Sequence, residues 1–285
     1  MENPISLIPF EPQHIPLGMQ LKSWANWNQV EADWNLLLQQ SSGGAFVATF
    51  DGESVGTTIT INYQAAFYWI GMVLVAPAHR GKGIGTHLLQ AALTYARRKG
   101  PIMLDATAMG QPLYHSLGFQ VAGEVVRMEG KIPTLLPQPT YFEIQNIKQE
   151  DLPLLSSYDK RHLQFDRNLL LLDFFHRAPA SAFKAVQDET IIGYCLGRAG
   201  SQFHQIGPLV ADNEEIAIAL LAAACRTASN RPLIIDAPTN KKHWVETLRT
   251  MGFTIQRSFA RMCCGEQYFA RQSLKPYAIA GPAFG

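Results

Sequence analysis

The hydrophobic positions of the first 130 residues recur at two spacings, one typical of strands and the other typical of helices. Apolar side chains three or four positions apart predict helices over residues 15–27 and 30–40, after a short strand over residues 5–10. Two runs of β-forming residues around a turn, 45–50 and 54–63, predict a hairpin. After one short strand, the chain is therefore predicted to form two helices and then a sheet.

A central strand and the elements after it complete the pattern. Residues 66–75 are hydrophobic at odd and even positions alike, as expected of a strand covered on both faces. They precede a predicted helix over 86–99, a buried strand over 102–106, a short helix over 111–117 and a final pair of strands over 119–128. Because strand–helix alternation follows a hairpin, the predicted fold class is α/β with a mixed sheet of α+β character.

Four dipeptides of the first half recur in the same order in the second half, at offsets between 131 and 136 residues. Four ordered matches at nearly one offset predict a duplicated fold, two tandem copies of one domain. The matches are Ile70-Gly71 with Ile206-Gly207, Asp105-Ala106 with Asp236-Ala237, Gly118-Phe119 with Gly252-Phe253, and Arg127-Met128 with Arg261-Met262. Prolines between the repeats predict a domain over 1–132, a linker over 133–141 and a second domain over 142–285.

Composition and charge exclude several classes of function. The 285 residues are 47% hydrophobic and 16% charged, which is a globular composition. Lysine and arginine number 24 against 23 acidic residues, so no overall field would hold a nucleic acid or an anionic membrane. The four cysteines have no spacing suited to zinc or to a disulfide framework, so we expect no metal. With no recognisable signal peptide or membrane span, we expect a cytoplasmic protein. We expect it to be a monomer or a homodimer.

The segment 80–86, between the central strand and its helix, reads Arg-Gly-Lys-Gly-Ile-Gly-Thr. Three glycines in five positions allow positive φ angles and turn several N–H groups toward one point. The helix start adds unpaired amides and a positive dipole end, and Arg80 and Lys82 add charge, so the segment predicts an anion site sized for a pyrophosphate. Gly83 after Lys82 excludes a Walker loop, and Leu88 stands where a dinucleotide fingerprint needs glycine.

Residues 80–85 resemble the R/Q-x-x-G-x-G/A signature with which the GNAT N-acetyltransferases bind acetyl-CoA, and Tyr114 to Phe119 resembles the Y-x-x-x-G-F helix of that family. The resemblance covers essentially all of residues 1–130. It implies a GNAT fold, acetyl-CoA as co-substrate, and a thioester held by backbone N–H groups of the central strand. The acetyl-CoA residues that it implies are Met72, Val73, Leu74, Val75, Arg80, Gly81, Lys82, Gly83, Ile84, Gly85 and Thr86.

The second half resembles another GNAT fold, that of the C-terminal region of the YitH-type acetyltransferases. The motifs that carry this resemblance are Tyr158-Asp159, Phe165-Asp166-Arg167, Ile206 to Leu209, Ile235 to Asn240, Gly252-Phe253 and Ala260 to Met262. Where a pyrophosphate loop should follow the strand, residues 210–215 contain no glycine and three carboxylates. Those charges would repel a pyrophosphate and cap the helix, so we expect one acetyl-CoA site per chain, in the first domain.

Acetyl transfer to an amine needs an acid for the departing thiolate and a base for the amine. Tyr114 matches the family tyrosine that lies near the sulfur, so its phenol is the predicted acid; alternatively, it packs with its hydroxyl on a backbone carbonyl. The base stays open among Asp105, His79, His115 and a water chain, and Asp105 could instead cap a turn.

The acceptor site is assigned to residues that the family resemblance places near the groove or in the second domain. These candidates are Trp27, Asp159, Asp166, Arg167, Asp236 and Asn240. Their carboxylates could bind an ammonium and Arg167 a carboxylate, as suits an amino acid or a related polar amine, or they could form an interdomain salt-bridge network.

The leading hypothesis is an acetyl-CoA-dependent N-acetyltransferase that acts on the primary amine of a small molecule by direct transfer in a ternary complex. The alternatives are a non-catalytic acyl-CoA-binding regulator and a protein or peptide N-acetyltransferase.

Overall fold

The computed structural model of the chain describes residues 4–64, 66–97, 100–131, 141–227, 231–265 and 276–285. Within these residues, thirteen strands form one sheet in the order β1-β2-β3-β4-β5-β12-β6-β11-β10-β9-β8-β7, with β13 beside β10. The strands are β1 (Ile5–Pro9), β2 (Ala45–Phe50), β3 (Glu53–Asn62), β4 (Tyr68–Val75), β5 (Ile102–Ala106), β6 (Gln120–Gly130), β7 (Glu143–Asn146), β8 (Phe183–Gln187), β9 (Thr190–Ala199), β10 (His204–Ala211), β11 (Leu233–Pro238), β12 (Thr254–Cys264) and β13 (Pro276–Ala278). The pairs β4–β5 and β10–β11 are parallel and the others antiparallel, so the predicted mixed sheet is confirmed.

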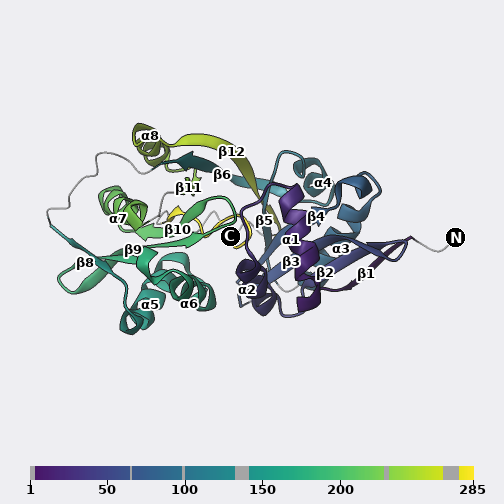
Figure 1. Cartoon of the computed structure of the whole chain (residues 1–285), viewed down its shortest axis with the longest axis horizontal. Coiled ribbons are helices and arrows are strands. Elements are labelled where there is room, and N and C mark those ends of the chain that lie inside the picture. The colour runs from purple at the N-terminus through teal and green to yellow at the C-terminus, as the bar shows by residue number, and fades with distance from the viewer. Residues whose placement is uncertain (1–3, 65, 98–99, 132–140, 228–230, 266–275) are drawn as a thin grey trace.

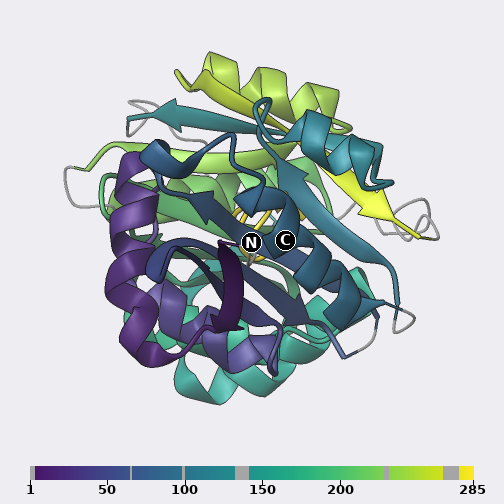
Figure 2. The same cartoon turned by 90° about the vertical axis from the view of Figure 1, so that its right-hand side faces the viewer.

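Helices cover both faces of this sheet. The α-helices of the described residues are α1 (Ile15–Trp24), α2 (Glu31–Ser41), α3 (Ile84–Ala96), α4 (Gln111–Ser116), α5 (Leu152–Leu163), α6 (Asn168–Arg177), α7 (Glu214–Thr227) and α8 (Lys242–Thr250). Figure 1 shows an elongated molecule of two halves, with α1–α4 beside β1–β5 in the first and α5–α8 in the second. In Figure 2, α1 and α2 lie on one side of the first half's strands and α3 on the other.

The central strand β4 is buried on both faces, as its sequence predicts. Tyr68 and Ile70 pack in one hydrophobic cluster with Leu89 of α3, whereas Trp69 and Met72 belong to another cluster on the opposite face. A strand covered on both sides has no polar face, which explains its unbroken run of apolar residues.

The two halves exchange their long C-terminal strands. β6 belongs to the first half by sequence but pairs with β11 of the second, and β12 of the second half pairs with β5 of the first. β6 and β12 also pair with each other, so the sheet runs unbroken through the middle of the molecule. Both strands cross between the halves in Figure 1.

Side chains follow the exchange. Met128 of β6 packs in the hydrophobic cluster of the second half, and Met262 of β12 packs with β4, β5 and α3 of the first. These two methionines occupy equivalent positions of the internal repeat. Each half therefore completes its core with a strand that the other half supplies.

Two arginine–aspartate pairs, one buried and one partly buried, join the exchanged strands to their new neighbours. Arg127 of β6 donates from Nε and Nη2 to the two oxygens of Asp236 on β11, at 2.8 and 2.9 Å. Arg261 of β12 donates in the same way to Asp105 on β5, at 2.8 Å for both bonds. Fork-to-fork pairing of this kind fixes orientation as well as charge. The internal repeat thus gives the same arginine–aspartate pair twice, and each pair joins a residue of one half to a residue of the other.

Some predicted boundaries are wrong. The final pair of strands predicted over 119–128 is one strand, β6, because its partners come from the second half. The helix predicted over 86–99 begins at Ile84 and ends at Ala96, since Arg97 takes an extended backbone; residues 98 and 99 lie outside the described residues. Residues 133–140 of the predicted linker lie there too.

Breaking the buried pair of Arg127 and Asp236 should destabilise the chain strongly. Asp236→Ala leaves the Arg127 guanidinium, with 7% of its side chain exposed, without a carboxylate. We expect a loss of about 3–5 kcal/mol in the free energy of unfolding, measured by urea denaturation, because a buried charge is left uncompensated. The control Glu246→Ala breaks an exposed pair with Arg249 and should cost less than about 1 kcal/mol. Equal small losses would contradict this assignment.

Candidate active site

A wedge opens in the sheet where β4 and β5 separate. The two strands pair at Tyr68 with Ile102 and at Trp69 with Met103, and no further pair follows in the described residues. Beyond Trp69 the strand bulges: Met72 has a φ of 54°, and the register with β3 shifts. The backbone edge of β4 that faces the wedge is therefore free of strand partners in the described part of the chain, which leaves its polar groups for a ligand.

A glycine cradle follows β4 and leads into α3. Gly81 and Gly83 have φ angles of 78° and 83°, and Gly83 is the residue before the first turn of α3. A Cβ at Gly81 would meet nothing within 4 Å, so the backbone there is open to a ligand. The first turn of α3 contains no acidic residue, so its unpaired N–H groups and positive dipole end are not offset by a charge of its own.

The two basic residues of this segment are held close to it. Arg80 donates from Nε to the carbonyl of Val75 at 3.2 Å, and the Lys82 ammonium lies 4.5 Å from the centroid of the Phe50 ring. Both residues are exposed. Backbone amides, a helix start and two cations therefore converge on one place, as an anion such as a pyrophosphate requires.

A pocket lies at the wedge and is assembled from separate stretches of both halves. Its space, including the open mouth, is about 590 Å³. The lining residues are Trp27, Gln29, Ile70, Gly71, Met72, Val73, Asp105, Thr107, Tyr114, Arg127, Arg257, Phe259, Pro282 and Ala283. The exchanged strands thus supply part of its wall.

Tyr114 brings a phenol into this pocket. Its ring meets Phe119 edge to face, with centroids 6.0 Å apart, and the side chain is half-buried. No group of the described residues hydrogen-bonds its hydroxyl, so the alternative of a hydroxyl fixed on a backbone carbonyl finds no support. Burial raises the pKa of this phenol to about 12, so it stays protonated at neutral pH and can donate a proton.

Family models match both halves of the chain. The model described as "Acetyltransferase (GNAT) family" matches residues 13–119, and the one described as "Acetyltransferase (GNAT) domain" matches residues 155–278. The chain belongs to the GNAT family. It is an N-acyltransferase built from two tandem GNAT folds, and this family implies an acyl-CoA co-substrate.

Two relatives share most of their length with this GNAT chain. A holothin acyltransferase of Pseudoalteromonas sp. (strain SANK 73390) is 25% identical over 82% of this chain and 80% of the relative. The uncharacterised N-acetyltransferase YitH of Bacillus subtilis (strain 168) is 25% identical over 87% of each chain, and its match confirms the predicted resemblance.

Solved structures share the architecture. A crystal structure of a Pyrococcus horikoshii protein assigned as an acetyltransferase superposes with a TM-score of 0.83 at 23% identity, over 100% of this chain and 97% of the other. A tandem GNAT protein from the clavulanic acid biosynthesis pathway superposes with a TM-score of 0.64 at 14% identity, over 91% and 98%. At identities this low, the superpositions establish the shared fold and nothing further.

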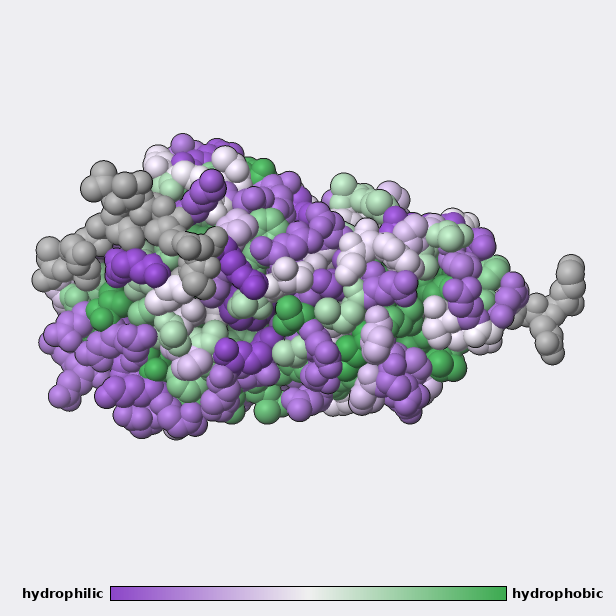
Figure 3. All heavy atoms as spheres, viewed as in Figure 1, coloured by the Kyte–Doolittle hydropathy of each residue, from purple (hydrophilic) through white to green (hydrophobic). Residues whose placement is uncertain are grey.

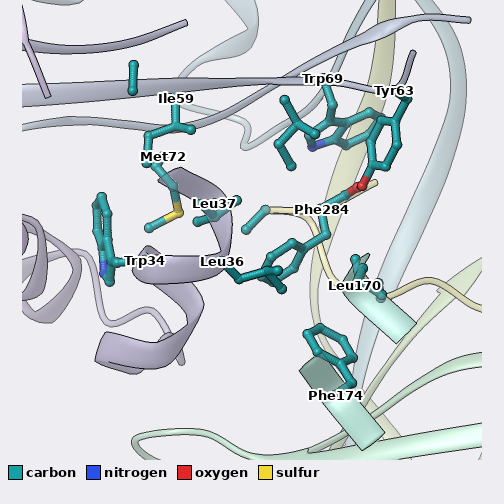
Figure 4. Close-up of a cluster of buried hydrophobic side chains, with 14 of the residues drawn as sticks. Trp34, Leu36, Leu37, Ile59, Tyr63, Trp69, Met72, Leu170, Phe174 and Phe284 are labelled. Atoms are coloured by element: carbon teal, nitrogen blue, oxygen red, sulfur yellow. The ribbon is translucent and has the colours of Figure 1, made fainter. Parts of the chain in front are cut away.

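The segment 279–285 of the GNAT chain runs from the second half into the first and forms one wall of the pocket. Trp69 donates from Nε1 to the carbonyl of Pro282 at 3.0 Å, and the Tyr63 hydroxyl donates to the carbonyl of Phe284 at 2.5 Å. Phe284 is buried and lies, as Figure 4 shows, between Trp69 of the first half and Phe174 of the second. This side of the pocket is therefore closed by the chain itself.

The equivalent wedge of the second half is filled. β10 and β11 pair over His204 to Ile206, and β13 then pairs with β10 where the strands would separate. Trp244 donates from Nε1 to the carbonyl of Tyr277 at 2.8 Å, which fastens β13 in place. The loop after β10 ends at Asn213, whose side chain accepts from the amide of Ile216 and caps α7, in place of the neighbouring carboxylates that the sequence predicts for this cap. Strand and cap together leave neither a wedge nor a cradle in this half's described residues.

The structure brings only some predicted acceptor residues to the pocket. Trp27 lines it, and Asp236 stands behind its wall because it binds Arg127. Arg167 instead pairs with Asp159 inside the second half, at 2.8 and 2.9 Å, and also donates to Tyr194 at 3.0 Å. These two charges satisfy each other and do not line the described pocket.

The remaining predicted residues are also placed. Asp166 accepts from the amide of Asn168 at the start of α6, and Asn240 lies exposed in a turn after β11. Asp105 lines the pocket, but Arg261 binds both of its oxygens; burial raises the pKa of this carboxyl against the opposing effect of Arg261. Because both oxygens already accept from Arg261, a proton taken from the amine would disrupt this pair, which disfavours Asp105 as the base. His79 and His115 are outside the lining residues.

Several lining residues carry no sequence signal that points to a site. Arg127 is one member of a repeated dipeptide, but nothing in that pattern places it in a pocket. Arg257, Phe259, Pro282 and Ala283 reach the first half through the strand exchange and the returning segment, which the sequence does not indicate.

The cradle predicts how a single methyl group should act. Gly85 lies in the first turn of α3, and a Cβ there would meet Leu113 Cδ2 at 3.4 Å, an ordinary contact. Gly85→Ala should therefore fold normally, but we expect acetyl-CoA binding at least about ten-fold weaker because the methyl group occupies the space that the phosphates approach.

Calorimetric titration should show one acetyl-CoA per wild-type chain and weaker binding in this variant. Gly123→Ala is the matched control, since a Cβ at this position of β6 would meet nothing within 4 Å and the residue is distant in sequence from the cradle. Two sites per chain, or equal affinities for the two variants, would refute the assignment.

Proposed function

We propose that the chain is an acetyl-CoA-dependent N-acetyltransferase that acetylates the primary amine of a small polar molecule, by direct transfer in a ternary complex. The observation that carries this proposal is the Tyr114 hydroxyl, unengaged in the described structure, in a pocket that begins at the wedge of β4 and β5. Acid, acyl-binding strand edge and acceptor space are then adjacent, as direct transfer requires.

The residues fit the co-substrate. When bound, acetyl-CoA supplies a thioester whose acyl group can pass to an amine. The cradle of residues 80–86 holds its pyrophosphate through backbone amides, and the wedge edge of Met72 to Val75 orients the acyl end. Tyr114 donates its phenolic proton to the thiolate as the carbon–sulfur bond breaks.

The acceptor must lose a proton before it attacks, and the pocket favours that loss. The Arg257 cation lines the pocket, and a neighbouring cation lowers the pKa of an ammonium group. The described pocket contains no histidine, and its carboxylate Asp105 is bound by Arg261. We therefore propose that water at the mouth of the pocket accepts the proton that the ammonium group loses.

A small acceptor is favoured over a peptide. Pro282 and Ala283 form a wall of the pocket, and the segment that contains them is anchored by Trp69 and Tyr63. A long open groove, which a protein or peptide acceptor would need, is therefore interrupted. The related holothin acyltransferase also supports a small-molecule acceptor.

On the face drawn in Figure 3, polar residues predominate over both halves and hydrophobic ones are dispersed among them. In the residues that the structure describes, no helix has the length and apolar character needed to cross a membrane.

Release of free CoA with a panel of amines tests the function. The panel comprises amino acids, polyamines, aminosugars, arylamines and short peptides, each with saturating acetyl-CoA. We expect turnover with small primary amines and little with peptides, detected as free thiol and confirmed by mass spectrometry of the product. Binding of acetyl-CoA without turnover of any amine would favour a regulator, and preference for peptides would favour a protein acetyltransferase.

Removal of one oxygen tests the proposed acid. Tyr114→Phe keeps the ring and its contact with Phe119, so folding and acetyl-CoA affinity should persist. We expect kcat to fall on the order of 10², because the thiolate then leaves unprotonated. The loss should shrink with an acyl thioester of a more acidic thiol. With a phenol pKa of about 12, Tyr114 should cause no decline of wild-type kcat below about pH 10. A Phe variant with unchanged kcat, when chemistry limits turnover, would make Tyr114 a packing residue.

A further inference from the structure

Arg257 reaches the pocket because of a bulge in β12. The register with β6 pairs Ile255 with Met128 and Arg257 with Arg127, which leaves Gln256 as an extra residue. Because side chains alternate between the two faces of a strand, this extra residue moves Arg257 to the face that Arg127 occupies. Without the bulge, Gln256 would stand there instead. The fold thus places a second guanidinium at the wall of the pocket.

The charges around this wall do not cancel. Arg127 is matched by Asp236, and Arg261 is matched by Asp105, with two hydrogen bonds in each pair. Asp236 also accepts from Gln205, so its oxygens are engaged. Arg257 makes no hydrogen bond or ion pair with any described residue, although its side chain is half-buried. One positive charge is therefore left over, facing the pocket.

The surroundings of Arg257 make its charge costly. Burial lowers the pKa of Arg257, the neighbouring Arg127 lowers it further, and Asp236 opposes them. Phe259, Pro282 and Ala283 add apolar surface to the same pocket. A half-buried cation among apolar groups and beside a like charge gains most from an anion that enters with the ligand.

We infer that the acceptor is an amine that also carries a carboxylate, such as an amino acid, and that Arg257 binds this carboxylate. This inference rests on the proposed function and names the class of its acceptor. A planar guanidinium offers two parallel N–H groups that match one carboxylate, and its single charge balances one carboxylate charge. The phosphates of acetyl-CoA have their own site in the cradle of residues 80–86. Arg257 therefore determines specificity for the acceptor and not affinity for the co-substrate.

Pairs of substrates that differ only in this carboxylate test its contribution to recognition. The common amino acids and their carboxamides differ in the charge that Arg257 would bind, and release of CoA gives kcat/KM for each. We expect wild-type chain to favour the acid of the best pair by roughly 10- to 100-fold. Arg257→Ala should reduce this ratio to about three-fold or less, mainly through KM of the acid, and Arg257→Lys should restore part of it.

Two controls separate specificity from general damage. Arg249→Ala removes an exposed arginine of α8 and should keep the wild-type ratio of acid to amide. The acetyl-CoA dissociation constant of Arg257→Ala, from calorimetry, should stay within about two-fold of the wild-type value. If that constant rises ten-fold while the ratio persists, Arg257 serves the co-substrate and the inference is wrong. Equal use of acids and amides by the wild-type chain would also overturn it.

Failure of every amine to release CoA would refute the proposed function, and direct binding then decides the role of Arg257. Titration with N-acetylglycine and with N-acetylglycinamide, in the presence of CoA, compares the same carboxylate and amide without turnover. Tighter binding of the acid by wild-type chain, lost in Arg257→Ala, would support a carboxylate site. No difference between the two ligands, or between the two chains, would exclude one.

Discussion

The exchange of β6 and β12 between the halves is the constraint on which the rest of the structure depends. β6 pairs with β11 of the second half and β12 pairs with β5 of the first, and each of the two exchanged strands carries an arginine that binds an aspartate of its new neighbour. An arginine taken out of water without its carboxylate would be costly. If only one of the two strands paired within its own half, an arginine and an aspartate would be left without partners, so the two strands must be exchanged together. The arrangement turns two folds into one sheet and places both halves around one pocket.

The C-terminal segment uses that arrangement in two ways. As β13 it fills the wedge of the second half, and a few residues later it lines the pocket of the first. Arg198 of the second half donates to the carbonyl of Ala280 at 3.0 Å and stacks 5.3 Å from the Phe284 ring, so the segment is held from both sides. One copy of the duplicated fold has thereby become support for the other, which keeps the glycine cradle.

The sequence predicts the parts of this molecule that depend on local pattern. The glycine cradle and the mixed sheet follow from motifs and from the order of neighbouring elements, the duplication follows from one repeated order of dipeptides, and each appears in the structure. The strand exchange cannot be predicted in the same way, because a repeat has the same sequence whether its last strand pairs within its own half or with the other. Asp105 and Arg261 both belong to repeated dipeptides, but nothing in the repeat marks them as partners.

The acceptor residues are harder to predict for a related reason. Asp159 and Arg167 are polar residues in recognisable motifs, yet a pair eight residues apart across the turn from α5 to α6 satisfies itself. Arg257 has no motif at all: its place depends on one extra residue in a strand whose partner is far away in sequence. What marks Arg257 is a half-buried charge without a partner among the described residues, and that property depends on the three-dimensional fold and not on a local pattern of sequence.

The long sequence separation of β5 from β12 has a consequence during synthesis. β5 is complete at Ala106, but the strand that covers its edge begins at Thr254, about 150 residues later. At a synthesis rate of about 5–20 residues per second, that edge waits on the order of ten to thirty seconds for its partner. An uncovered edge of hydrophobic strand can pair with other chains, so this interval, and not the finished fold, is when the protein is most exposed to aggregation and to help from chaperones.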